Sequence, residues 1–270
     1  MITGDWSVLL WSMGVLVAML SSHLFIAWIR RAKGLLRPRD ALGPAAVSAG
    51  ALAVGLSSAM VLALGAERLA FPLGYRWPAL PLLLVVAFAL CLGAAWSLIR
   101  RQNLPALAGA GLLMALASMA VQVGWLQAAG FRPGLTWNLP LAAGAATAAL
   151  VGYTAAMWLA YSDGSSIVAR RTLWRLGAAT LMVLTMVASQ EVLITAAGLP
   201  VQIGSIFRGE LSSTWLTLVA GAAVPTVLAL LVLDVALRNQ GDSQRNRRSP
   251  TGVELDLPRS RKRRRKYRTL

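Results

Sequence analysis

Long apolar stretches separated by short polar or basic segments make up the first 237 residues of the chain. Because about 20 apolar residues in a helix cross a hydrocarbon core ~30 Å thick, a stretch of that length is able to span a membrane. Seven windows of 20 to 25 residues qualify, at 6–29, 43–65, 78–99, 104–126, 139–161, 173–197 and 214–237. The pattern predicts an all-α bundle of seven transmembrane helices in one domain, 1–237.

The predicted helices also repeat two at a time. In each pair the first helix ends near a Trp, and the second carries one conspicuous side chain about ten residues before a proline. These side chains are Met60, Gln122 and Gln190, spaced 62 and 68 residues apart. A period above sixty residues fits a two-helix unit repeated in a membrane. We therefore predict three two-helix repeats plus one extra helix, 214–237.

Small and aromatic residues add expectations about packing and depth. A tryptophan lies near the end of the first helix of each pair. We interpret these residues as an aromatic belt at one membrane interface and not as a ligand site; they are Trp28, Trp96 and Trp158.

Lipid supplies no hydrophobic force between helices, so close packing must provide the attraction. Such packing is predicted where small residues cluster, at 49–55, 108–111 and 142–146.

Composition and charge support a multi-pass membrane protein and predict its orientation. The chain is 57% hydrophobic and 13% charged. Lys and Arg number five, two, three and twelve in the alternate segments 30–42, 100–103, 162–175 and 238–270, against four in the segments on the other side. Because positive loops stay in the cytoplasm, we predict an external N-terminus and a cytoplasmic C-terminus. A single cysteine, Cys91, allows no intrachain disulfide.

The tail, 238–270, has twelve basic and three acidic residues and almost no apolar periodicity, which predicts a disordered segment. Three partners fit its charge: anionic lipid, which we favour because each cation near such a surface contributes about 1 kcal/mol, an acidic protein surface, and nucleic acid, which is least favoured. The densest part of the basic run is Arg261, Lys262, Arg263, Arg264, Arg265 and Lys266.

Polar side chains inside the predicted helices are the candidate functional residues, because ionisable groups are costly there. The second helices of the three pairs run in the same direction, so Met60, Gln122 and Gln190 are expected at one level. Glu191 would be the ionisable member of a small polar pocket at that level. The alternative is that the glutamines only bridge helices, for roughly 0.6 kcal/mol per hydrogen bond.

The repeats resemble the MHYT family of bacterial seven-helix inner-membrane sensors, in which each repeat carries a Met-His-Tyr-Thr motif near the outer end of its second helix. The segment 55–72, GLSSAMVLALGAERLAFP, resembles the first motif region, with Met60 at the histidine position. Its matching or nearly matching residues are Gly55, Ser58, Arg68 and Pro72. The resemblance covers residues 6 to about 200 and implies a bacterial inner membrane.

In that family the motif histidines, with methionines, are proposed to bind a metal, copper, and so to sense a diatomic gas. Met60, Gln122 and Gln190 stand at the three histidine positions here, and glutamine is a poor copper ligand. The metal role therefore does not carry over, and no cofactor is expected. A residual thioether site remains as an alternative to plain packing, formed by Met60, Met119 and Met186.

Catalytic patterns are not evident in the sequence. A single histidine, His23, has no acid or nucleophile beside it, and no phosphate-binding glycine loop follows an apolar segment. We expect a non-catalytic sensor, regulatory or assembly subunit that acts through a membrane-protein partner or a second copy of itself. The alternative is a small-solute or ion transporter or channel that uses Glu191.

Overall fold

The computed structural model describes residues 7–33, 35, 38–67, 73–101, 103–131, 134–161, 168–198, 205, 207 and 211–248. Arg68, Pro72 and the basic run from Arg261 to Lys266 lie outside these residues. The chain divides into two compact units, 1–232 and 233–270, and the description below concerns the first.

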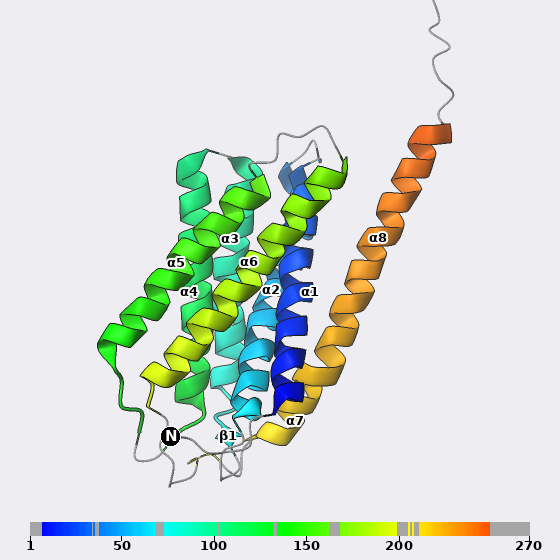
Figure 1. The fold of residues 1–270 in the computed structure, drawn as a ribbon. Coiled ribbons are helices and arrows are strands. Elements are labelled where there is room, and N and C mark those ends of the chain that lie inside the picture. Colours follow the sequence, from blue (N-terminus) through cyan, green and yellow to red (C-terminus); the bar gives the residue numbers. More distant parts are fainter. Residues whose placement is uncertain are drawn as a thin grey trace, which may run out of the picture. The chain divides into compact units, whose positions relative to one another are not determined.

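The described chain is almost entirely helical (Figure 1). Seven spans in it are long and apolar enough to cross a membrane, which confirms the all-α seven-helix bundle. The last span begins in a short helix, passes through a π-helix and continues as α8 to Arg248, so α8 takes in residues 238–248 of the predicted tail. The elements are α1 (Val8–Lys33), α2 (Pro38–Ala66), β1 (Gly74–Tyr75), α3 (Ala79–Arg100), α4 (Leu104–Ala128), α5 (Leu139–Tyr161), α6 (Val168–Ala196), β2 (Leu211–Ser212), α7 (Ser213–Leu218), η1 (Val219–Ala223) and α8 (Val224–Arg248).

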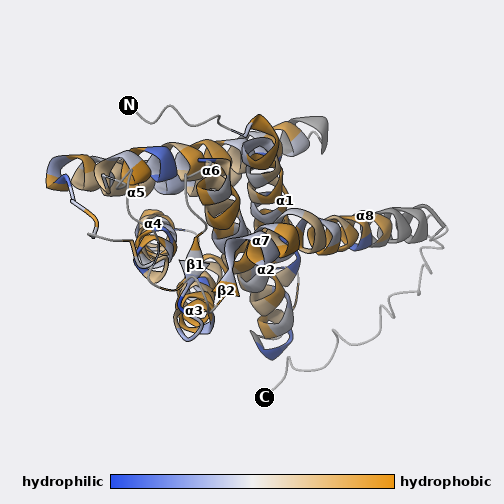
Figure 2. Ribbon diagram, turned by 90° about the horizontal axis from the view of Figure 1, so that it is seen from below, coloured by the Kyte–Doolittle hydropathy of each residue, from blue (hydrophilic) through white to orange (hydrophobic). Residues whose placement is uncertain are grey.

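The helices pack most extensively in the pairs α1 with α2, α3 with α4 and α5 with α6, which are the predicted two-helix units. Helix α2 lies at the centre of the bundle, because it also contacts α3, α4 and α7 and its span is 83% buried. Figure 2 shows hydrophobic residues on outward as well as inward faces of the helices. Leu82 and Leu184, for example, are 63% and 60% exposed, a surface that suits a lipid surround.

Small residues let several helices approach closely. Gly55 lies against Ser21, Gly152 lies against Thr185, and an added Cβ at either glycine would collide with the facing side chain. Gly111 packs in the same way on Thr154. Close approach is therefore found at Gly55 of the run 49–55 and at Gly111 of the run 108–111, whereas Gly109 faces open space. In the run 142–146, Ala145 is fully buried, and Gly144 faces open space on the side of α5 that turns away from the other helices.

Backbone hydrogen bonds tie the connecting segments together at one end of the bundle, which we call the strand end. There β1 pairs antiparallel with β2, with Gly74 opposite Ser212. The start of α1 meets the end of α2 where the Ser7 N–H donates to the Ala66 carbonyl at 3.0 Å. The Arg76 N–H donates to the Ala128 carbonyl at the end of α4, and the Asn138 N–H, just before α5, donates to the Ala196 carbonyl at the end of α6. The starts of α1 and α5 and the ends of α2, α4 and α6 therefore meet at the strand end.

Candidate functional site

The three positions marked by the repeats are all inside the bundle. Met60 in α2, Gln122 in α4 and Gln190 in α6 are 0%, 2% and 4% exposed. Helix α4 contacts both α2 and α6. Burial of two primary amides among apolar helices is costly unless their polar atoms find partners, so their hydrogen bonds decide what the site is.

Gln122 is the centre of a hydrogen-bonded group that joins three helices. Its Nε2 donates to Ser118 Oγ at 3.1 Å and to Ser189 Oγ of α6 at 3.2 Å. The hydroxyl of Tyr153, from α5, donates to Ser118 Oγ at 3.2 Å. We call Ser118, Gln122, Tyr153 and Ser189 the amide cluster. All four are buried, so the cluster fixes the register of α4, α5 and α6.

One acceptor of the amide cluster has no donor. Gln122 Oε1 is buried and has no hydrogen-bond partner among the described residues. Turning the amide over would give this oxygen the serine hydroxyls but would leave Nε2 without its two acceptors. Leaving such a group unpaired costs about 1–3 kcal/mol. A donor of the size of a water molecule or a small polar ligand would satisfy it.

Gln190 and Glu191 point into different surroundings although they are neighbours in α6. Gln190 follows Ser189 of the amide cluster and is buried. Glu191 is half-buried, and its Oε1 accepts a hydrogen bond from Trp11 Nε1 of α1 at 3.1 Å. The structure therefore links Gln122 to the residue before Gln190 and directs Glu191 toward α1.

A second carboxyl, Glu67, lies near Glu191. Glu67 follows the last residue of α2 at the strand end, and burial together with the negative charge of Glu191 raises its pKa. We call Glu67 and Glu191 the acidic pair. The sequence interpretation missed Glu67 by treating it as part of a loop; its place directly after an apolar helix that ends beside the start of α1 was the available signal.

The three methionines of the predicted thioether site differ in burial. Met60 and Met186 are buried, whereas Met119 is half-buried. Met186 offers its backbone carbonyl to Ser189 Oγ at 3.0 Å. Within the described residues no group of three or more His, Cys, Asp or Glu side chains is placed to hold a metal. Because the marked positions offer one thioether and two amides, this donor set does not fit a copper centre built on imidazoles.

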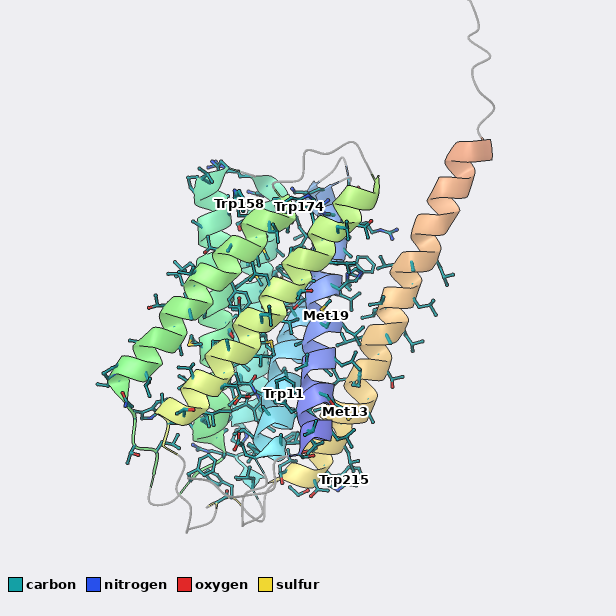
Figure 3. The ribbon with its side chains drawn as sticks, in the orientation of Figure 1. Trp11, Met13, Met19, Trp158, Trp174 and Trp215 are labelled. Atoms are coloured by element: carbon teal, nitrogen blue, oxygen red, sulfur yellow. The ribbon has the colours of Figure 1, made fainter. Side chains whose placement is uncertain are left out.

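Tryptophans occupy both ends of the bundle. Figure 3 shows Trp158 and Trp174 at one end of α5 and α6 and Trp215 at the strand end. Trp158 is 53% exposed, as an aromatic belt requires. Trp28 differs, since it is 9% exposed and its ring lies 5.4 Å from the Arg31 guanidinium carbon. The repeated Trp positions therefore share depth but not surroundings.

Comparison of the chain with protein-family models, with curated proteins and with solved structures finds no match. The MHYT resemblance stays a prediction based on the residues quoted for it.

Proposed function

We propose that this protein is a non-catalytic integral-membrane module that senses a signal or regulates a partner protein, as its resemblance to the MHYT family suggests. The observation that carries the proposal is the amide cluster. It lies at the position that the repeats mark, it joins α4, α5 and α6, and it leaves Gln122 Oε1 open to one more donor.

An occupant of the amide cluster would act on α6 through Ser189. A group that donates to Gln122 Oε1 would fix the amide plane and with it the hydrogen bond to Ser189 Oγ. Since α6 is a continuous helix from Val168 to Ala196, a small shift at Ser189 reaches its opposite end. The bound and empty states would then differ in the surface presented to a partner.

We further propose that the protein resides in a bacterial inner membrane with its strand end outside and its C-terminus in the cytoplasm. The Lys and Arg counts in alternate segments support this orientation. The run from Arg261 to Lys266 would then lie against anionic lipid. A membrane-protein partner or a second copy of this chain receives the signal.

Chemical cross-linking in native membranes, followed by solubilisation in mild detergent and mass spectrometry, tests this function. We expect a membrane protein, or a second copy of the chain, to be linked to it in reproducible proportion. A chain that is recovered alone after cross-linking would contradict the role of regulatory subunit.

The acidic pair favours transport of protons or cations as a second candidate. Two carboxyls close enough to influence each other, one of them bonded to Trp11 inside the bundle, are able to exchange a proton or to hold a cation. Vesicles that contain the purified protein would take up protons or cations, and Glu191→Gln would abolish the flux. If the flux of Glu191→Gln equals that of the unmodified protein, the acidic pair is not the route of transport.

A further inference from the structure

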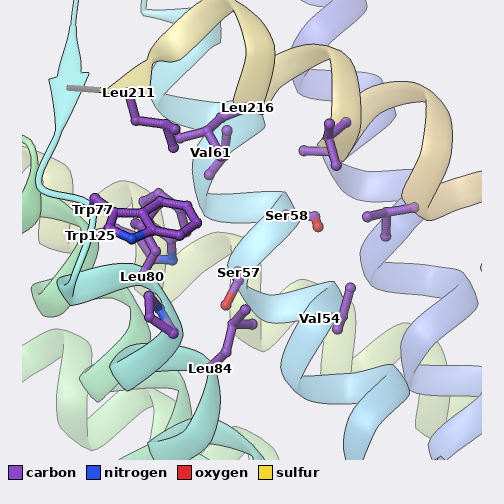
Figure 4. Close-up of a pocket in the computed structure, with 14 residues that line it drawn as sticks. Val54, Ser57, Ser58, Val61, Trp77, Leu80, Leu84, Trp125, Leu211 and Leu216 are labelled. Atoms are coloured by element: carbon purple, nitrogen blue, oxygen red, sulfur yellow. The ribbon is translucent and has the colours of Figure 1, made fainter. Parts of the chain in front are cut away.

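A cavity of about 340 Å³ lies in the first unit between α2, α3, α4 and the segment α7–η1 (Figure 4), and no member of the amide cluster lines it. Its wall includes Val54, Ser57 and Leu84. Small-molecule sites in proteins measure roughly 300–1,000 Å³, so this cavity is large enough for part of a ligand.

The mouth of the cavity faces the surroundings of the bundle. Val54, Leu84 and Val219 line it, and they are 36%, 36% and 49% exposed. All three lie within the membrane-spanning helices. A molecule that enters from this side comes from the hydrocarbon layer, which favours a lipid over a water-borne solute. The cavity also reaches Trp77, which is 63% exposed and precedes the span that begins at Ala79.

Two polar atoms interrupt the apolar wall. Ser57 Oγ of α2 and Trp125 Nε1 of α4 are buried without a hydrogen-bond partner among the described residues. Ser57 differs in this from Ser21 and Ser189, whose hydroxyls donate to backbone carbonyls three residues earlier. An indole N–H only donates and has a fixed direction, so Trp125 requires an oxygen acceptor on the occupant. The hydroxyl of Ser57 is able to turn toward a carbonyl of its own helix, so Ser57 tolerates an apolar occupant.

With the end of α4 at the membrane interface, as the length of the span predicts, Trp125 would lie at the depth of a lipid ester. It stands three residues before the end of α4, or ~4.5 Å from that end at about 1.5 Å per residue. Ser57 lies nine residues before the end of α2, about 13 Å inside by the same rise. An acyl chain whose ester lies at Trp125 therefore reaches the depth of Ser57.

The wall on the side of the last span is a π-helix. Val219 and Ala220 of η1 line the cavity. Single π-helical turns within α-helices are rare and are frequent at functional sites, because the extra residue displaces the backbone. The π-helix η1 is therefore a second, independent observation that favours a binding site here.

We propose that this cavity binds one acyl chain of a membrane phospholipid, with the ester carbonyl accepting a hydrogen bond from Trp125 Nε1 and the chain lying along Ser57. The proposal does not depend on the sensor function, since it concerns a different set of side chains.

Photo-labelling tests it directly. The full chain is reconstituted in vesicles of phosphatidylethanolamine and phosphatidylglycerol that contain a phospholipid with a diazirine in its acyl chain. After illumination, labelled peptides are mapped by mass spectrometry. We expect labelling of Val54–Val61 and of η1 to exceed, several-fold, labelling of the groove between α4 and α5 that Ala155 lines.

Three variants separate the parts of the proposal. Ser57→Leu fills the cavity with an apolar side chain and should lower its labelling several-fold. Trp125→Phe keeps an aromatic ring against Tyr75, whose ring centroid lies 5.2 Å away, and should lower labelling by removing the donor. Ala155→Leu, in the other groove, should leave it unchanged.

Equal labelling of the two grooves, or a signal that Ser57→Leu and Trp125→Phe do not change, would overturn the proposal.

Discussion

Gln122 of α4 donates a hydrogen bond to Ser189 of α6 at 3.2 Å, across 67 residues of sequence and inside the bundle. This contact connects the second and third predicted repeats at the level that their spacing marks. It makes the amide cluster both a structural joint and the candidate binding site.

Removing the Gln122 amide should destabilise the bundle. Gln122→Leu deletes the hydrogen bonds to Ser118 and Ser189. With Oε1 paired by the proposed occupant, we expect a loss of about 1–2 kcal/mol, since such bonds contribute roughly 0.6–1 kcal/mol each. Thermal unfolding in detergent measures the loss. Gln127→Leu is the matched control, because Gln127 lies exposed on the same helix. Equal melting temperatures for the two variants would show that the amide cluster carries no stability.

The acidic pair predicts a pH dependence. The pKa of Glu67 is raised by burial and by Glu191, so its contribution to stability is fully present below the ordinary value of 4.5 and is lost as the pH rises through the folded-state pKa. Glu67→Gln should therefore raise the melting temperature more at neutral pH than at pH 4.5, by ~1–3 °C because solvent screens a half-exposed group. Asp40→Asn, an exposed carboxylate in α2, serves as control. A gain from Glu67→Gln that is the same at both pH values would contradict this assignment.

Two glycines of α5 should respond in opposite ways to the same change. Gly152→Ala places a Cβ against the stiff side chain of Thr185, whose Oγ1 is held by the Leu181 carbonyl, and should cost about 1–3 kcal/mol. Gly144→Ala meets open space and should gain about 0.5–1 kcal/mol. Unfolding of both proteins in detergent checks the pair, and similar effects would mean that α5 and α6 are not in close contact.

The purified protein should hold less than one copper or iron per chain. Met60, Gln122 and Gln190 offer no imidazole, so a tight metal site has no basis in their chemistry. Elemental analysis after dialysis against a chelator measures the content. One tightly held metal ion per chain would contradict the assignment of the marked positions to a metal-free site.

Deletion of residues 259–270 should weaken binding to anionic lipid and leave the bundle folded, because the deleted run carries eight positive charges. Flotation with vesicles of phosphatidylglycerol, compared with phosphatidylcholine, measures the change. Unaltered flotation and unaltered co-purification would leave the tail with a topological role alone.

The sequence predicted the seven spans because their length and hydropathy are set by the membrane, whatever the helices contact. Which face of a helix turns inward depends on its neighbours, and a helix that is apolar all round gives no signal of it. Trp28 and Trp158 therefore looked equivalent, although one is 9% and the other 53% exposed.

The same limit applies to the candidate site. Gln122 stood out as an amide in an apolar stretch, and its burial was expected. Ser118 and Ser189 did not, because a serine hydroxyl is inexpensive in a membrane helix when it bonds to its own backbone. Tyr153 did not, because its ring is largely apolar. Their assembly around Gln122 follows from the packing of α4, α5 and α6, which short polar side chains do not reveal one at a time.

The most direct measurement compares partner association in native membranes for the unmodified protein and for Gln122→Leu, Gln127→Leu and Gly55→Ala, by quantitative cross-linking. Gly55→Ala places a Cβ against Ser21, between α2 and α1, which hold no member of the amide cluster. It therefore separates loss of stability from loss of the site. We predict that Gln122→Leu alone changes the yield of the cross-linked partner by several-fold. An equal yield from all four proteins, or an equal fall for Gln122→Leu and Gly55→Ala, would contradict the regulatory role of the amide cluster.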